Sequence, residues 1–317
     1  IGAWWLCPWI PSLPRRTGKT GGIVRFAGKV YCQFSVRYCT QNIDNLLVGW
    51  RFNAVALGLY KKAYDLFTLS GSQLTAPLNN VALAALSRLN HDHIRFRRYL
   101  ANSLGIIAFV GMAMSADLTL VGRDVVRVVL GPKWSESGRI FEVFGPGIGA
   151  MLLSSTVGWI HLSIGKPGRW LRWSLVELAF TVSLFLAGLP WGPLGVATAW
   201  SVSYWVLLIP AFWYAGHPIG FSASVLMATI WRYTAAALLA GSMTAAIIRG
   251  TPFWGTQIGT GCALGAIIAI SRFLVTLYCT TLTTFHWGLG PLRHLASLLS
   301  ELITSRNAAI QVAEAEA

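Results

Sequence analysis

The sequence predicts an all-α membrane protein, a polytopic bundle of about eight transmembrane helices. Of its 317 residues, 55% are hydrophobic and only 11% are charged, whereas soluble domains carry about 25% charged residues. This is too little charge to cover the surface of a soluble protein of this size. The 15 Trp and 15 Phe residues suit membrane interfaces, and the 32 Gly residues suit close helix contacts.

The spacing of charged residues predicts where the helices cross the membrane. Long runs contain no Asp, Glu, Lys or Arg, and most of them reach the ~20 residues that span a bilayer. The longest run, 178–231, is divided by turns at Leu189-Pro190-Trp191-Gly192-Pro193 and at His217-Pro218, and Arg249-Gly250-Thr251-Pro252 predicts a hairpin. The predicted spans are therefore 22–48, 64–88, 100–122, 140–165, 171–189, 193–215, 222–248 and 253–281.

The distribution of Lys and Arg predicts the orientation of the bundle. More basic residues fall on the side that holds both termini and the loops at 89–99, 166–172 and 216–221. Because cytoplasmic loops are enriched in Lys and Arg, both termini are expected in the cytoplasm. The tail, 283–317, has leucines at helical spacing, which predicts an amphipathic surface helix with a frayed end.

Several signals of soluble or enzymatic function are absent or incomplete. Gly18-Lys19-Thr20 cannot end a phosphate-binding loop, because position 13 is leucine. His91-Asp92-His93 lies in a basic loop and predicts a solvated segment rather than a metal site. The five cysteines are widely spaced and form no CxxC pair. The chain is therefore expected to be no enzyme and to bind no metal or cofactor. Its net charge of +14 reflects topology rather than nucleic-acid binding, because the basic residues interrupt apolar runs.

Polar residues inside the predicted helices are the features that suggest a function. The first span carries Arg37 and the cluster Gln41-Asn42-Ile43-Asp44-Asn45, and Arg51 follows it. Such groups are costly in hydrocarbon, so they are expected to line an aqueous cavity or to pair with each other. The same expectation applies to Gln73, Asn79 and Asn80 in the second span. Glu177 interrupts the fifth span, either as an intramembrane ion pair or interfacial residue or as a functional group.

Three glycine pairs have the GxxxG spacing of close helix contacts: Gly145/Gly149, Gly255/Gly259 and Gly261/Gly265. They predict ordinary helix packing rather than a dedicated dimer face.

Several segments, taken in order, resemble bacterial lipopolysaccharide and exopolysaccharide flippases, which belong to the multidrug/oligosaccharidyl-lipid/polysaccharide exporter superfamily. The similarity covers about residues 22–215, and the last two spans share only hydropathy. The segments that carry it are Gln41-Asn42-Ile43-Asp44-Asn45-Leu46-Leu47-Val48-Gly49, Ala56-Leu57-Gly58-Leu59-Tyr60-Lys61-Lys62-Ala63-Tyr64, Leu74-Thr75-Ala76-Pro77-Leu78, Val129-Leu130-Gly131-Pro132-Lys133-Trp134, Thr156-Val157-Gly158-Trp159 and Leu189-Pro190-Trp191-Gly192-Pro193.

The resemblance implies a domain organisation. The family has two six-helix lobes around a central cavity. Residues 1–21 would be the end of a preceding helix and the linker between lobes, 22–215 the second lobe, 216–282 two additional helices, and 283–317 the cytoplasmic tail. The first lobe would be absent from this chain. Partners would then be the missing first lobe or a second copy, besides membrane lipids.

The resemblance also implies a function in the bacterial inner membrane, namely translocation of a lipid-linked oligosaccharide by alternating access. Arg37 and Arg51 would attract the pyrophosphate of a polyprenyl pyrophosphate glycan, because guanidinium pairs well with phosphate oxygens. Asp44 or Glu177 would couple the movement to a cation or proton. The saccharide would meet Asn42, Asp44, Asn45, Gln73, Asn79 and Asn80. Arg37, Asp44, Arg51, Gln73 and Asn80 are therefore expected on one open, concave face.

Two alternatives remain. A drug/cation antiporter of the same superfamily would share the fold, although a net-positive interior favours an anionic substrate. A membrane glycosyltransferase or polymerase of the same pathway would need a sizeable loop outside the membrane, and the longest loop expected, 123–139, is short for an active site.

Overall fold

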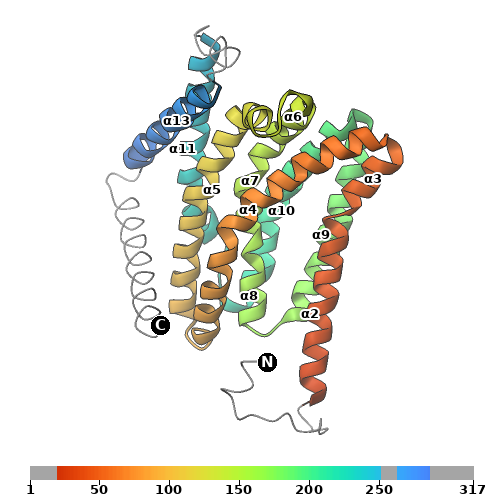
Figure 1. Cartoon of the computed structure of the whole chain (residues 1–317). Coiled ribbons are helices and arrows are strands. Elements are labelled where there is room, and N and C mark those ends of the chain that lie inside the picture. Colours follow the sequence, from red (N-terminus) through yellow and green to blue (C-terminus); the bar gives the residue numbers. More distant parts are fainter. Residues whose placement is uncertain (1–19, 251–262, 286–317) are drawn as a thin grey trace, which may run out of the picture.

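The chain is built from α-helices joined by short turns, as a computed structural model of residues 20–250 and 263–285 describes it (Figure 1). No strand occurs among these residues, so the predicted all-α membrane bundle is confirmed. The helices are α2 (Thr20–Thr40), α3 (Ile43–Arg51), α4 (Ala54–Arg88), α5 (His93–Leu130), α6 (Ser135–Phe144), α7 (Ile148–Ser155), α8 (Val157–Ser163), α9 (Pro167–Gly188), α10 (Gly192–Gly216), α11 (Ala223–Gly250) and α13 (Ala263–Phe285).

The predicted spans coincide with these helices. The first falls on α2 and α3 together, the fourth on α6, α7 and α8 in succession, and the others on single helices. Within the described ranges, five stretches are long and apolar enough to cross a membrane, and one of them, Pro167–Ile219, contains both α9 and α10. None of the five includes α2 or α3, which agrees with the polar character of the first predicted span. Helix α4, which carries the second predicted span, is not among the five either.

Capping residues and glycines set the ends of the helices. Asn53 caps α4 by accepting a hydrogen bond from the amide of Ala56 at 2.8 Å. Asp92 caps α5 by accepting from the amides of Ile94 and Arg95 at 3.1 and 3.0 Å. The His91-Asp92-His93 segment thus begins a helix. Gly192 separates α9 from α10 with a φ of 76°, a left-handed conformation that glycine adopts without strain.

The long helix α5 holds the centre of the packing. It contacts α6, α7, α11 and α13, while α2 packs along α9 at the opposite edge of the molecule (Figure 1). Its 38 residues extend ~57 Å, well beyond the ~30 Å hydrocarbon core. Helix α4 crosses the bundle obliquely from the end of α3 to the start of α5.

Small residues allow the closest helix contacts, as the GxxxG pairs predict. A side chain at Gly145 would meet the backbone of Thr119 on α5 at 2.8 Å, and one at Gly149 would meet the carbonyl of Gly111 at 3.2 Å. In contrast, a side chain at Gly265 would meet nothing within 4 Å. Gly255, Gly259 and Gly261 lie outside the described residues.

The predicted ends of the chain are not described. Residues 1–19, most of the predicted linker, and 286–317, most of the predicted tail, lie outside the described ranges, as do 251–262 at the start of the last predicted span. The division into a second lobe and two additional helices stays a prediction.

Candidate functional site

A break between α2 and α3 presents polar groups inside the bundle. The helix ends at Thr40 and restarts at Ile43, and the intervening Gln41 and Asn42 form a turn. The Asn42 side-chain amide donates to the Tyr38 carbonyl at 2.8 Å, which ties the turn to the end of α2. The backbone amides of Gln41 and Asn42 still donate to the carbonyls of Arg37 and Cys39, at 3.0 and 3.2 Å, so both are paired at the break.

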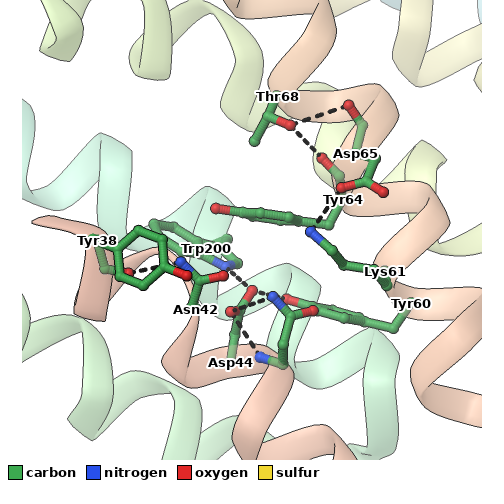
Figure 2. Close-up of polar contacts among 10 residues, drawn as sticks. Tyr38, Asn42, Asp44, Tyr60, Lys61, Tyr64, Asp65, Thr68 and Trp200 are labelled. Carbon is green, nitrogen blue, oxygen red and sulfur yellow. Dashed lines mark hydrogen bonds and ion pairs between the residues drawn. The ribbon is translucent and has the colours of Figure 1, made fainter. Parts of the chain in front are cut away.

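Asp44 is fully buried just after this break, where donors from three other residues surround its carboxylate. The Tyr60 hydroxyl and the Trp200 indole N–H donate to Oδ2 at 2.7 and 2.8 Å. The backbone amide and the side-chain amide of Asn45 donate to Oδ1 at 2.7 and 3.3 Å. Figure 2 shows the carboxylate between the Trp200 and Tyr60 side chains. Asp44 thus joins α3 to α4 and α10.

An aromatic cluster includes the Tyr60 and Trp200 donors of this network. Its members are Tyr60, Tyr64, Phe67, Phe144, Trp200 and Tyr204. Phe67 and Phe144 stack at 4.7 Å between ring centroids, and Trp200 and Tyr204 at 5.2 Å. Because these rings come from α4, α6 and α10, they fix the positions of the three helices relative to each other.

A polar cavity of about 370 Å³ opens beside the cluster, between α2, α4, α7 and α10. On α4, Lys61 forms an ion pair with Asp65 at 2.8 Å and lies 5.5 Å from the Tyr64 ring centroid (Figure 2). The polar cavity is lined by Arg37, Tyr38, Gln41, Asn42, Lys61, Tyr64, Asp65, Thr68, Gly71, Ser72, Thr75, Met151, Leu152, Ser155 and Tyr204.

Arg37 also lies at two much smaller spaces, here called the inner pockets, of about 20 and 10 Å³. Both contain Glu177 and Tyr204 as well as Arg37. Gln33, one turn earlier on α2, donates to the Ser174 hydroxyl of α9 at 3.3 Å. Helices α2 and α9 therefore face each other through polar side chains. Arg37 stands between the open cavity and the half-buried carboxylate of Glu177.

The structure brings only some of the predicted site residues together. Arg37 and Asn42 line the polar cavity, and Asp44 and Asn45 lie beneath it in the buried network. Arg51 is exposed at the end of α3 and lies over the Phe52 ring at 5.8 Å. The expected concave face therefore does not include Arg51, and Asp44 does not open onto it.

The predicted residues of α4 lie further along the helix. Gln73 is exposed and does not line the polar cavity. The Asn79 side chain accepts a hydrogen bond from the Trp159 indole N–H at 2.7 Å, so it joins α4 to α8. The side chain of Asn80 lies outside the described residues.

Sequence reasoning missed Lys61, Tyr64, Asp65 and Tyr204 as cavity residues. It assigned Lys61 to a loop because the second span was expected to begin at residue 64, whereas α4 begins ten residues earlier, at Ala54. Lys61 and Asp65 are four residues apart, and so are Tyr60 and Tyr64. This helical spacing is the signal that would have placed these four residues of α4 on one helix.

No metal site is evident at this cavity. Among the described residues, no group of three or more His, Cys, Asp or Glu side chains is placed to hold a metal ion. The donor set of the polar cavity is instead two cations, one carboxylate, amides and hydroxyls, which suits hydrogen bonding to a polar or anionic molecule.

The fold and the polar cavity define a class: a multi-pass helical membrane protein with a polar cavity inside the bundle. Comparison with solved structures gives the same fold. The lipid II flippase MurJ, in an inward closed conformation, superposes with a TM-score of 0.63 at 14% sequence identity, covering 80% of this chain and 52% of MurJ.

Comparison of sequences shows which known proteins the chain resembles. The family described as polysaccharide biosynthesis protein matches residues 1–139. The teichuronic acid biosynthesis protein TuaB of Bacillus subtilis (strain 168) is 25% identical over 193 residues, which are 60% of this chain and 40% of TuaB. An uncharacterized membrane protein in the cps region of Klebsiella pneumoniae is 20% identical over 184 residues, 55% of this chain and 38% of that protein.

These findings confirm the resemblance to flippase-type polysaccharide biosynthesis proteins. The chain spans about two fifths of the length of the curated relatives it matches.

Proposed function

We propose that this chain forms one lobe of a transporter that moves a lipid-linked oligosaccharide across the bacterial inner membrane by alternating access. The observation that carries the proposal is the polar cavity in an otherwise apolar bundle, with Arg37 and Lys61 on its wall. A pyrophosphate and a glycan cannot cross hydrocarbon unaided, since each unsatisfied polar group costs several kcal/mol there. The fold and the family similarity support the same proposal.

Arg37 is the proposed partner of the pyrophosphate, because guanidinium matches phosphate oxygens with two parallel hydrogen bonds. Lys61 contributes a second positive charge on the opposite wall, on α4, although it also pairs with Asp65. Arg51, which the sequence suggests for the same role, is not at this cavity. The proposed anion site therefore consists of Arg37 and Lys61.

The saccharide is proposed to contact the amide and hydroxyl groups of the same cavity. Gln41 and Asn42 are held at the break between α2 and α3, and Thr68, Ser72 and Thr75 follow one face of α4. Amides and hydroxyls donate and accept, so they suit sugar hydroxyls. Asn45 and Asn79 are weaker candidates for contact with the saccharide, because the side chain of each already forms a hydrogen bond within the protein.

Glu177 is the proposed coupling residue. It shares both inner pockets with Arg37, so a change in the charge of Glu177 acts on Arg37 across a short distance. Asp44 is a weaker candidate than Glu177 for the coupling residue, because its carboxylate is fully buried and accepts four hydrogen bonds. Its proposed role is to hold α3 against α4 and α10.

A second lobe is the proposed partner, either a first lobe or a second copy of this chain. The edge helix α2 supports this proposal, since it exposes Ile23, Tyr31, Phe34 and Tyr38, and Tyr38 also lines the polar cavity. Both termini are proposed to lie in the cytoplasm, as the Lys and Arg distribution indicates.

The proposal is tested in a bacterial strain that lacks the gene for this protein. Restoration of lipid-linked glycan at the outer face of the inner membrane by the intact protein supports it. Efflux of cationic dyes without glycan translocation would instead identify an antiporter, and glycan lengthening by the purified protein would identify an enzyme.

A further inference from the structure

A second cavity system lies on the outer side of the bundle, away from the polar cavity. Two spaces of about 630 Å³ each share Thr119, Glu142, Pro146 and Trp205, so they form one continuous depression, here called the outer groove. Its walls come from α5, α6, α10 and α11. The indole N–H of Trp205 is paired with the Pro146 carbonyl at 2.8 Å, which leaves an apolar ring surface toward the groove.

Contacts between the helices place one end of the groove beside the charged end of α5. A side chain at Gly241 of α11 would meet Ala116 of α5 at 3.5 Å, and one at Gly105 would meet Thr229 at 3.8 Å. Helices α5 and α11 therefore run parallel, and Arg249, two turns after Gly241, lies level with the charged end of α5. On α6, the backbone of Glu142 lies beside Gly122.

The other end of the groove is deep and apolar. On α11 it reaches Thr234 and Ala237, and on α5 it reaches Met112. From Arg249 to Thr234 the helix rises ~22 Å, compared with ~15 Å of hydrocarbon for one leaflet of a ~30 Å core. The groove is thus long enough for an acyl chain, with its polar end at headgroup depth.

The charges at the polar end are of both signs. Glu142 lines both spaces, Arg139 lines one and Arg249 lines the other. Arg139 forms an ion pair with Glu136 at 3.3 Å, and both side chains are half exposed. Within the part of the chain that the structure describes, neither Glu142 nor Arg249 belongs to an ion pair.

We propose that the outer groove binds one molecule of phosphatidylethanolamine, with its ammonium at Glu142, its phosphate at Arg249 and Arg139, and an acyl chain along α11. A zwitterionic headgroup complements a carboxylate set between two guanidinium groups. An anionic phospholipid such as phosphatidylglycerol would bring its phosphate to the arginines but would offer no positive charge to Glu142. A trimethylammonium headgroup carries no N–H and cannot donate a hydrogen bond to the carboxylate.

The test uses the intact protein in lipid nanodiscs, followed by native mass spectrometry of the lipids retained after transfer to detergent. Phosphatidylethanolamine, phosphatidylcholine and phosphatidylglycerol with identical acyl chains are supplied in equal amounts, and undecaprenyl phosphate is added in a separate arm. The wild-type protein is expected to retain phosphatidylethanolamine at least tenfold over phosphatidylcholine, which corresponds to ~1.4 kcal/mol.

Substitutions assign the preference to the groove. Glu142→Gln should bring the ratio close to one, because the neutral amide no longer favours an ammonium donor. Asp124→Asn, which removes a carboxylate at the same end of the bundle but outside the groove, should leave the ratio unchanged. Arg249→Gln should lower the retention of all three phospholipids, whereas Arg123→Gln should not.

Equal retention of phosphatidylethanolamine and phosphatidylcholine by the wild-type protein would overturn the proposal. This comparison uses only the wild-type protein, so it does not depend on whether a variant folds. Preference for phosphatidylglycerol or for undecaprenyl phosphate would overturn it as well, by assigning the groove to an anionic lipid. If Glu142→Gln keeps the wild-type ratio of phosphatidylethanolamine to phosphatidylcholine, the preference for phosphatidylethanolamine arises outside the outer groove and the proposal is wrong.

Discussion

The indole N–H of Trp200 donates a hydrogen bond to the buried carboxylate of Asp44 at 2.8 Å, across 156 positions of sequence. Tyr60 donates to the same oxygen at 2.7 Å. One carboxylate thus connects α3, α4 and α10 beside the polar cavity (Figure 2). Since an unsatisfied buried carboxylate is unfavourable, the three residues are expected to act as a unit in stability.

Trp200→Phe should lower the free energy of unfolding by ~1–3 kcal/mol, because the buried carboxyl group of Asp44 loses a hydrogen-bond donor. Tyr60→Phe should have an effect of similar size. The matched control is Tyr64→Phe, one turn further along α4, because the Tyr64 hydroxyl has no hydrogen bond to Asp44. Thermal unfolding in a fixed detergent measures all three. Equal melting temperatures for Tyr60→Phe and Tyr64→Phe would contradict the proposed role of Asp44.

Gly145→Ala should destabilise the bundle by ~1–3 kcal/mol, because the added methyl group overpacks against the backbone of Thr119. Gly265→Ala serves as the control, since nothing lies within 4 Å of the added group and alanine favours a helix. The same unfolding assay compares them. A loss at Gly265 as large as that at Gly145 would mean that the α5 contact is not the cause.

Arg95→Cys should be labelled by a membrane-impermeant maleimide only from the cytoplasmic side, in a variant whose native cysteines are replaced. Arg95 is suitable because its side chain is 76% exposed near the start of α5. Val129→Cys, near the opposite end of the same helix and also exposed, should be labelled only from the periplasm. The reverse pattern would invert the proposed orientation.

Glu177→Gln should reduce glycan translocation roughly tenfold, ~1.4 kcal/mol, if Glu177 is the coupling residue beside Arg37. Glu177→Asp should retain most of the activity, because it keeps the charge. Glu136→Gln, which removes an exposed carboxylate on α6, is the control for loss of one negative charge. Full translocation by Glu177→Gln would remove Glu177 from the mechanism.

The sequence was sufficient to predict most of the helices, because the local composition of a segment determines whether it can span a membrane. The Leu189-Pro190-Trp191-Gly192-Pro193 turn separates α9 from α10 as predicted. Proline and glycine determine such turns through their own backbone preferences. The early start of α4 was not predicted, because the charged residues Lys61, Lys62 and Asp65 hide the beginning of the helix in a hydropathy pattern.

The candidate site was harder to predict because it depends on contacts between distant segments. Trp200 lies in an apolar run, and nothing in its surroundings shows that its N–H reaches Asp44. The polar character of Arg37 and Asn42 was sufficient to place them at a cavity. The same reasoning grouped Arg51 with them, although two further turns of α3 carry it away from the cavity.

The most direct test of the central claim is glycan translocation by Arg37→Gln and Arg51→Gln, measured as lipid-linked oligosaccharide reaching the outer face of the inner membrane in a deletion strain. The claim is that Arg37, at the polar cavity, binds the anionic part of the substrate. Translocation should fall at least tenfold for Arg37→Gln, while Arg51→Gln, which removes the same charge outside the cavity, should stay close to wild type at equal expression. Unchanged translocation by Arg37→Gln would contradict the claim.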